Sequence, residues 1–128
     1  MIKIRRIAAV IGLGLLMSGA FVHAQDSAAQ ARQHFNEGSE AFRDKRFREA
    51  ALHYEAAGKL RPHPSAFFTA AMAWDKAEDP SRAADDFAKA LDLPGLNPKD
   101  TKVARDRLTS LERSLGTVVV KGPSELVV

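Results

Sequence analysis

Residues 38–62 read GSEAFRDKRFREAALHYEAAGKLRP, and residues 71–95 read AMAWDKAEDPSRAADDFAKALDLPG. Both stretches carry small residues and one aromatic at the same intervals, counted from Gly38 in the first copy and from Ala71 in the second. Small residues let two helices cross closely, and an aromatic beside them fills the remaining gap. The second copy begins 33 residues after the first. This offset is close to the roughly 34 residues that are typical of helical hairpins stacked on their neighbours. The positions that share the spacing are Gly38, Ala50, Tyr54, Ala57 and Pro62 in the first copy and Ala71, Ala83, Phe87, Ala90 and Gly95 in the second.

The hydrophobic pattern predicts an all-α fold of two helical hairpins plus a closing helix. Apolar residues recur at intervals of three and four, which fits the helical period. Ser65 is expected to cap the third helix and Asp79 the fourth, and Gly116 is expected to end the fifth. The closing helix should pack one face on the last hairpin and leave the other in water. The expected helices run over about 28–42, 47–61, 66–77, 81–91 and 99–115.

The end of the chain changes character. Residues 117–121 are rich in β-branched side chains, a turn follows at 122–124, and residues 125–128 could form a second strand. Because a lone two-stranded hairpin is marginal in water, this tail is expected either to begin a β domain or to pair with a partner's sheet edge. The expected organisation is a signal peptide over 1–24, a flexible segment over 25–30, a helical domain over 31–116 and a β tail over 117–128.

Residues 1–24 have the order of a secretory signal peptide. Three basic side chains, Lys3, Arg5 and Arg6, precede an apolar run over 7–17, and a small-x-small site ends at Ala24. Cleavage after Ala24 would deliver the protein to the periplasm or outer cell envelope. An uncleaved membrane anchor and a twin-arginine export signal are the alternatives. Membrane contact is expected only through this segment, and only if it is uncleaved.

Charge and cysteine content exclude several classes of protein. The chain has 19 basic and 16 acidic side chains, and removing the three basic residues of the signal leaves equal numbers. The mature chain is therefore neutral, and nothing in its charge favours nucleic-acid binding. There is no cysteine, which excludes disulfides, thiolate metal sites and thiol catalysis.

No residue set predicts catalysis or a cofactor. His34, His53 and His63 lack the helical spacing of metal ligands and are interpreted as surface or packing residues, so no metal site is predicted. Asp85 and Asp86 are assigned to the solvated face of the fourth helix. The chain has no glycine-rich phosphate loop, nucleophile elbow or paired-carboxylate arrangement, and it is not expected to be an enzyme.

Residues 31–98 resemble tetratricopeptide repeats. That family places a small residue midway in one helix, then Ala, a large aromatic and another small residue in the next, followed by Pro. The first copy matches at all five of its shared positions, and the second has Gly95 where Pro is usual. The tail sequence LGTVVVKGP, residues 115–123, is similar to the opening of PEGA-type β domains of cell-envelope proteins. In the second copy, the residues that match the family pattern are Phe67, Ala71, Trp74, Ala83, Phe87 and Ala90.

The resemblance implies a non-enzymatic protein–protein interaction scaffold of the bacterial cell envelope. Such repeats bind a peptide or a partner helix on the concave surface formed by the first helix of each hairpin. Phe35 and Phe68 would be apolar anchors there, and Arg43 and Lys76 would steer acidic partners. The alternative for Phe35 and Phe42 is a place in the core. The positions carried over to this surface are Arg32, Phe35, Ser39, Phe42, Arg43, Phe68, Met72, Asp75 and Lys76.

Two other outcomes stay open at this point. Repeat arrays usually need about three units, so two hairpins and a closing helix would gain from partner packing or self-association. The alternative function is a structural attachment module, in which the helices are a spacer and the PEGA-like tail docks to the cell wall or a membrane complex. The partner's identity does not follow from the residues.

Overall fold

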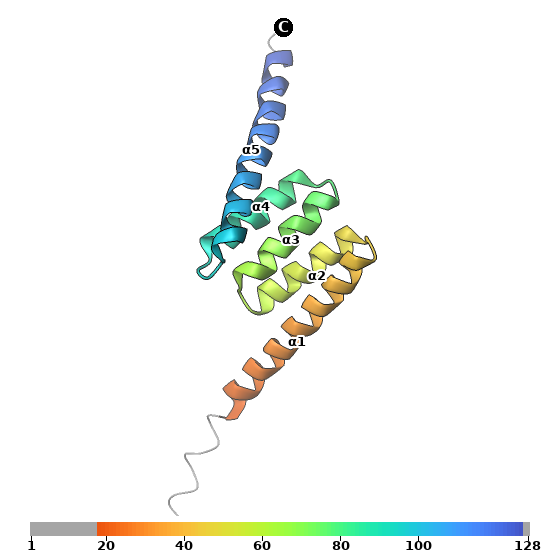
Figure 1. The fold of residues 1–128 in the computed structure, drawn as a ribbon, viewed down its shortest axis with the longest axis vertical. Helices are drawn as coiled ribbons and strands as arrows, with labels where there is room; N and C mark the ends of the chain where they lie inside the picture. The colour runs from red at the N-terminus through yellow and green to blue at the C-terminus, as the bar shows by residue number, and fades with distance from the viewer. Residues whose placement is uncertain (1–17, 127–128) are drawn as a thin grey trace, which may run out of the picture.

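The structure is a computed structural model that describes residues 18–126, with side chains described over 23–116. Its five helices are α1 (Ser18–Arg43), α2 (Phe47–Leu60), α3 (Pro64–Lys76), α4 (Pro80–Asp92) and α5 (Pro98–Leu126). Each helix packs mainly against the next one along the chain, and α1 and α5 lie at opposite ends of the series (Figure 1). The predicted all-α class is therefore confirmed for the described residues.

The turns inside the two hairpins share one geometry. Each turn holds one residue in the left-handed region, Lys45 at φ 61° and Glu78 at φ 59°. In the first turn the N–H of Arg46 donates to the carbonyl of Ala41 at 2.8 Å. The second turn repeats this bond at the equivalent positions, where the N–H of Asp79 donates to the carbonyl of Trp74 at 3.0 Å. Such a bond closes the last turn of a helix, so two turns with different sequences position their helices in the same way.

The two predicted helix caps had different outcomes. Asp79 caps α4 as predicted, since its Oδ1 accepts the N–H of Arg82 at 3.2 Å. Ser65 does not cap α3. That helix begins at Pro64, and the Nδ1 of His63 accepts the N–H of Ser65 at 3.2 Å. Proline suits the first helical position because its φ is already fixed and its missing N–H would have no partner there.

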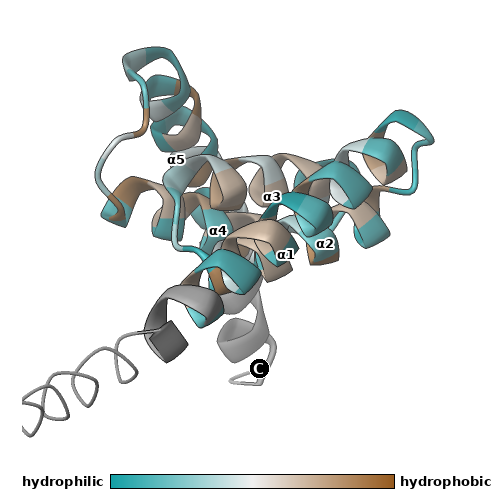
Figure 2. Ribbon diagram, turned by 90° about the horizontal axis from the view of Figure 1, so that it is seen from below, coloured by the Kyte–Doolittle hydropathy of each residue, from teal (hydrophilic) through white to brown (hydrophobic). Residues whose placement is uncertain are grey.

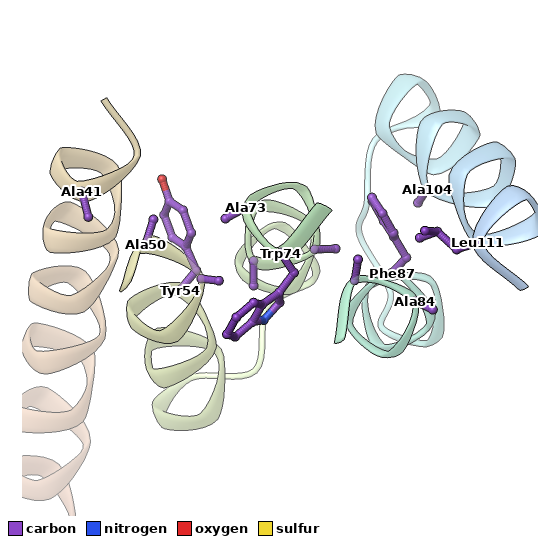
Figure 3. Close-up of a cluster of buried hydrophobic side chains, with 13 residues drawn as sticks. Ala41, Ala50, Tyr54, Ala73, Trp74, Ala84, Phe87, Ala104 and Leu111 are labelled. Atoms are coloured by element: carbon purple, nitrogen blue, oxygen red, sulfur yellow. The ribbon is translucent and has the colours of Figure 1, made fainter. Parts of the chain in front are cut away.

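The core is a seam of alanines with three aromatic rings set into it (Figure 3). Tyr54 fills the α1–α2 crossing, where a Cβ built on Gly38 would lie only 2.9 Å from the ring. The Trp74 side chain of α3 points away from the Tyr54 ring, and Phe87 of α4 lies near Ala104 of α5 (Figure 3). Of the residues that match the repeat pattern, Pro62 after α2 and Gly95 after α4 are exposed, and all the others are buried.

The last helix buries a single stripe over the residues whose side chains are described, 98–116. Ala104 and Leu111 are buried, Leu108 and Leu115 are half-buried, and Val103 is exposed. Hydrophilic and hydrophobic residues alternate along the helices, as helices that bury one stripe require (Figure 2). The expectation that one face of this helix packs on the last hairpin therefore agrees with its contacts to α4.

The helices at both ends are longer than predicted. α1 includes residues 25–30, which were expected to be flexible, and residues 18–24 of the predicted signal peptide, while residues 1–17 lie outside the described part. No described helix combines the length and apolar character that crossing a bilayer requires.

The β tail is not present in the part of the chain that the structure describes. Residues 117–126 continue α5, and residues 127–128 lie outside the description. Gly116 does not end the helix, and among the described glycines it is Gly95, in the α4–α5 connection, that has a positive φ, at 99°. Isolated β-branched residues favour a strand only where a partner strand completes their hydrogen bonds, whereas a helix completes them within its own segment.

Candidate functional site

The predicted binding residues lie on α1 and α3, and we call this set of nine residues the α1–α3 face. Its two proposed anchors make matching contacts. The ring of Phe35 lies 5.0 Å from that of Tyr54, and the ring of Phe68 lies 6.0 Å from that of Phe87. Phe35 and Phe68 are half-buried and packed against the core. Each therefore belongs partly to the core, as the alternative interpretation of Phe35 held, and still offers part of its ring to solvent.

The middle of the face has little free hydrogen-bonding capacity. The Ser39 hydroxyl donates to the backbone carbonyl of Phe35 at 2.9 Å and accepts from the Tyr54 hydroxyl at 3.2 Å. Met72 takes the equivalent position on α3 and is half-buried against the core. A partner would therefore meet mainly apolar atoms here.

One end of the face is cationic and aromatic. The Lys76 ammonium lies 6.0 Å from the ring centre of Phe42 and 5.6 Å from that of Phe47, and the two rings pack edge to face at 5.2 Å. These distances are within the range of cation–π attraction. Arg43, next to Phe42, is exposed and has no ion-pair partner within residues 23–116.

The single acid of the face is already paired. Both carboxylate oxygens of Asp75 accept from Arg107 of α5, at 2.6 and 2.7 Å. This contact raises the pKa of the Arg107 guanidinium and ties α3 to α5. Arg107 was not predicted, because a contact across 32 residues leaves no local spacing signal. Asp75 is thus unsuited to the partner contact assigned to it, and the unpaired charges of the face are positive.

A cavity of about 280 Å³ opens beside α1 at the other end of the face. Its wall is mostly alanine and the ring of Phe35, with Arg32 and Arg61 among the lining residues. Both arginines are exposed and have no ion-pair partner in the part of the chain whose side chains are described. The cavity therefore combines an apolar floor with positive charge.

A buried carboxylate lies on α4, outside the α1–α3 face. Asp86 is 1 % exposed, so its assignment to a solvated face was wrong, whereas Asp85 is exposed. Burial raises the pKa of Asp86 to about 6, and the nearby charge of Glu55 adds to that effect. A hydrogen bond from Lys89 to Oδ1 at 3.0 Å opposes it. Glu55 in turn accepts the indole N–H of Trp74 at 2.6 Å, which links α2, α3 and α4.

The three histidines fall into two groups. His63 caps α3, as described above. His34 of α1 and His53 of α2 meet, with 3.3 Å between their Nδ1 atoms, and the carboxylate of Glu37 lies beside both. Spacing within one helix could not predict this cluster, because it forms between two helices.

Comparison with known proteins adds no further information about this site. No protein-family model, no curated protein and no solved structure matches the chain.

Proposed function

We propose that this protein is a non-catalytic interaction module that binds an acidic peptide or helix of a partner protein across the α1–α3 face. The observation that carries the proposal is the composition of that face. Half-buried aromatic rings are flanked there by basic side chains, and the one acid is paired internally. In this proposal the two hairpins and α5 form a short solenoid of the tetratricopeptide kind, acting in the periplasm or cell envelope after export.

The apolar part of the face is suited to capturing side chains. Phe35 and Phe68 are held by Tyr54 and Phe87, so their rings lose little freedom when a partner arrives. Aromatic residues supply much of the energy at protein interfaces, above all when binding removes them from water. Both rings still have exposed area to lose.

The charges of the face favour an acidic partner. Arg32, Arg43 and Lys76 are exposed, and Arg61 adds a fourth positive charge beside the cavity. Complementary charge speeds association and orients the partner, while a basic partner would be repelled.

The order of helix packing supports an open array. The main contacts join consecutive helices, and α1 and α5 lie at opposite ends (Figure 1). A closed bundle would bring the first and last helices together and bury the α1–α3 face. Sequential packing is the arrangement in which a face made of alternate helices can stay accessible.

The proposal is tested by selecting peptides from a displayed random library on the purified protein. Peptides enriched in Asp and Glu around apolar residues are expected. The double variant Arg43→Glu, Lys76→Glu should reverse that charge preference, and Lys59→Glu, an exposed charge reversal on α2, should not. Phe68→Ala should weaken the best peptide at least about tenfold, whereas Leu52→Ala on the exposed side of α2 should not.

Circular dichroism separates binding from folding in these variants. A fully helical Phe68→Ala variant with weakened binding supports the proposal. Equal losses of helicity and binding would make Phe68 a core residue only. Selection of the same peptides by the wild-type protein and the double variant would contradict the electrostatic part of the proposal.

A further inference from the structure

We propose that His34, Glu37 and His53 form a binding site for a divalent transition-metal ion of the zinc type. The three side chains come from two helices, and one potential ligand atom of each lies within 4.8 Å of the others. This site is separate from the proposed interaction with an acidic partner and does not depend on it.

The distances between the potential ligand atoms match one face of a tetrahedral zinc site. The two Nδ1 atoms are 3.3 Å apart, and Glu37 Oε2 lies 3.5 Å from Nδ1 of His34 and 3.2 Å from Nδ1 of His53. Zinc bonds to nitrogen and oxygen of about 2.0–2.2 Å place neighbouring tetrahedral ligands about 3.3–3.6 Å apart. An ion could therefore contact all three atoms with little movement of the side chains.

Hydrogen bonding alone does not satisfy the cluster. If one imidazole donates its Nδ1–H to the other, the accepting Nδ1 has no proton to offer Glu37. If both Nδ1 atoms carry protons for Glu37, two N–H groups face each other across the same short distance. Protons can thus satisfy at most two of the three contacts, whereas a cation attracts all three lone pairs at once.

The helix crossing holds the ligands in place. His34 and Glu37 are one turn apart on α1, and His53 faces them from α2. The two helices approach closely beside the cluster, where Gly38 leaves room for the ring of Tyr54. Ligands on two packed helices are fixed more firmly than ligands on loops.

The donor set selects the class of metal. Two imidazole nitrogens and one carboxylate suit Zn²⁺, Cu²⁺, Ni²⁺ and Fe²⁺, while Mg²⁺ and Ca²⁺ prefer sites made only of oxygen. The three side chains are 27–38 % exposed, so an ion can enter from solvent and keep water or another ligand in the remaining position.

A further carboxylate is placed to orient one ligand. Glu49 Oε1 lies 4.0 Å from Nε2 of His53, on the side of the ring away from Nδ1. Arg46 holds the same oxygen at 2.6 Å. With Nδ1 bound to a metal, the Nε2–H of His53 would face this carboxylate, which is the usual outer arrangement of metal-binding histidines.

The test is Zn²⁺ titration of the full chain by calorimetry after chelator treatment, together with Co²⁺ as a spectroscopic substitute. The wild-type protein should bind one Zn²⁺, its melting temperature should rise with Zn²⁺, and bound Co²⁺ should give a ligand-field absorption spectrum. His53→Ala should weaken Zn²⁺ binding by at least about 100-fold, and Glu37→Gln by at least about tenfold, since losing even an outer partner typically costs about 10–100-fold.

His63→Asn is the matched control, because it removes an imidazole outside the cluster and keeps a side-chain oxygen to cap α3. Its Zn²⁺ affinity should equal that of the wild type. Circular dichroism without metal shows whether His53→Ala is folded, and Glu37→Gln gives an independent test if it is not. Absence of Zn²⁺ binding by the wild type, or equal binding by all variants, would overturn the proposal and leave a hydrogen-bonded histidine pair.

Discussion

The α1–α2 and α3–α4 hairpins share a framework and differ in the chemistry set beside it. Phe35 on Tyr54 in the first hairpin corresponds to Phe68 on Phe87 in the second. The residues directly before Phe35 and Tyr54 are His34 and His53, which face each other. The corresponding residues of the second hairpin are Phe67 and Asp86. The shared spacing fixes the helix crossing, and the adjacent positions are free to vary.

The place of each hairpin in the array decides what such a variable position can do. His53 is on α2, and its side chain remains 27 % exposed beside the outermost helix α1. Asp86 is on α4, is 1 % exposed, and lies close enough to Glu55 of the preceding hairpin to interact with it. Equivalent positions thus give an accessible polar cluster in the first hairpin and a buried carboxylate in the second. The comparison can be tested by altering one hairpin at a time.

The largest expected effect concerns the buried carboxylate and pH. The pKa of Asp86 is raised from 3.8 to about 6, so the folded protein binds this proton more readily than the unfolded chain. The contribution of Asp86 to stability therefore falls as pH rises from about 4 to above 6, by up to ~3 kcal/mol. Asp86→Asn removes this titration. Lys89, whose pKa is also raised, stays charged throughout this range.

Chemical denaturation of both proteins between about pH 4 and pH 8 measures the effect. The stability of the wild type relative to Asp86→Asn should decline with rising pH, since the titrations of groups that do not interact with Asp86 cancel in the difference. A difference that does not change with pH would mean that the pKa of Asp86 is the same in the folded and the unfolded protein.

The next effect tests whether the two helix crossings are equally tight. Ala50 and Ala83 occupy equivalent positions and are both fully buried. Replacing either with Leu should overpack its crossing and cost ~1–3 kcal/mol. Thermal melts of the two variants are the measurement. An unchanged melting temperature in both would argue against close packing inside the hairpins.

The smallest effect concerns the small-residue position at which the two crossings differ, Gly38 in the first and Ala71 in the second. A Cβ on Gly38 would lie 2.9 Å from the Tyr54 ring and 3.2 Å from the Ala50 carbonyl. Gly38→Ala should therefore destabilise by about 1 kcal/mol despite its better helix propensity. Ala71→Gly should cost about 1–2 kcal/mol, through lower helix propensity and the loss of a buried methyl group. Urea denaturation would detect both, and a stabilised Gly38→Ala variant would contradict the tight first crossing.

The error at the chain end shows where local patterns fail. Residues 117–121 have strand propensity, yet α5 runs to Leu126. Propensity for strands depends on a sheet to join, and the described residues offer none. The predicted cap of α3 was wrong by two residues, since the helix begins at Pro64 and His63 takes the cap position assigned to Ser65.

The amino-acid sequence by itself determined the helices over 47–92 and the turns between them, because apolar periodicity, prolines and capping residues act over a few neighbouring positions. Only the tertiary structure decided that His53 meets Glu37, that Asp75 meets Arg107 and that Asp86 is buried. These outcomes depend on how two helices cross and on what covers them. Both are set by packing between segments that are far apart in the chain, which no local spacing records.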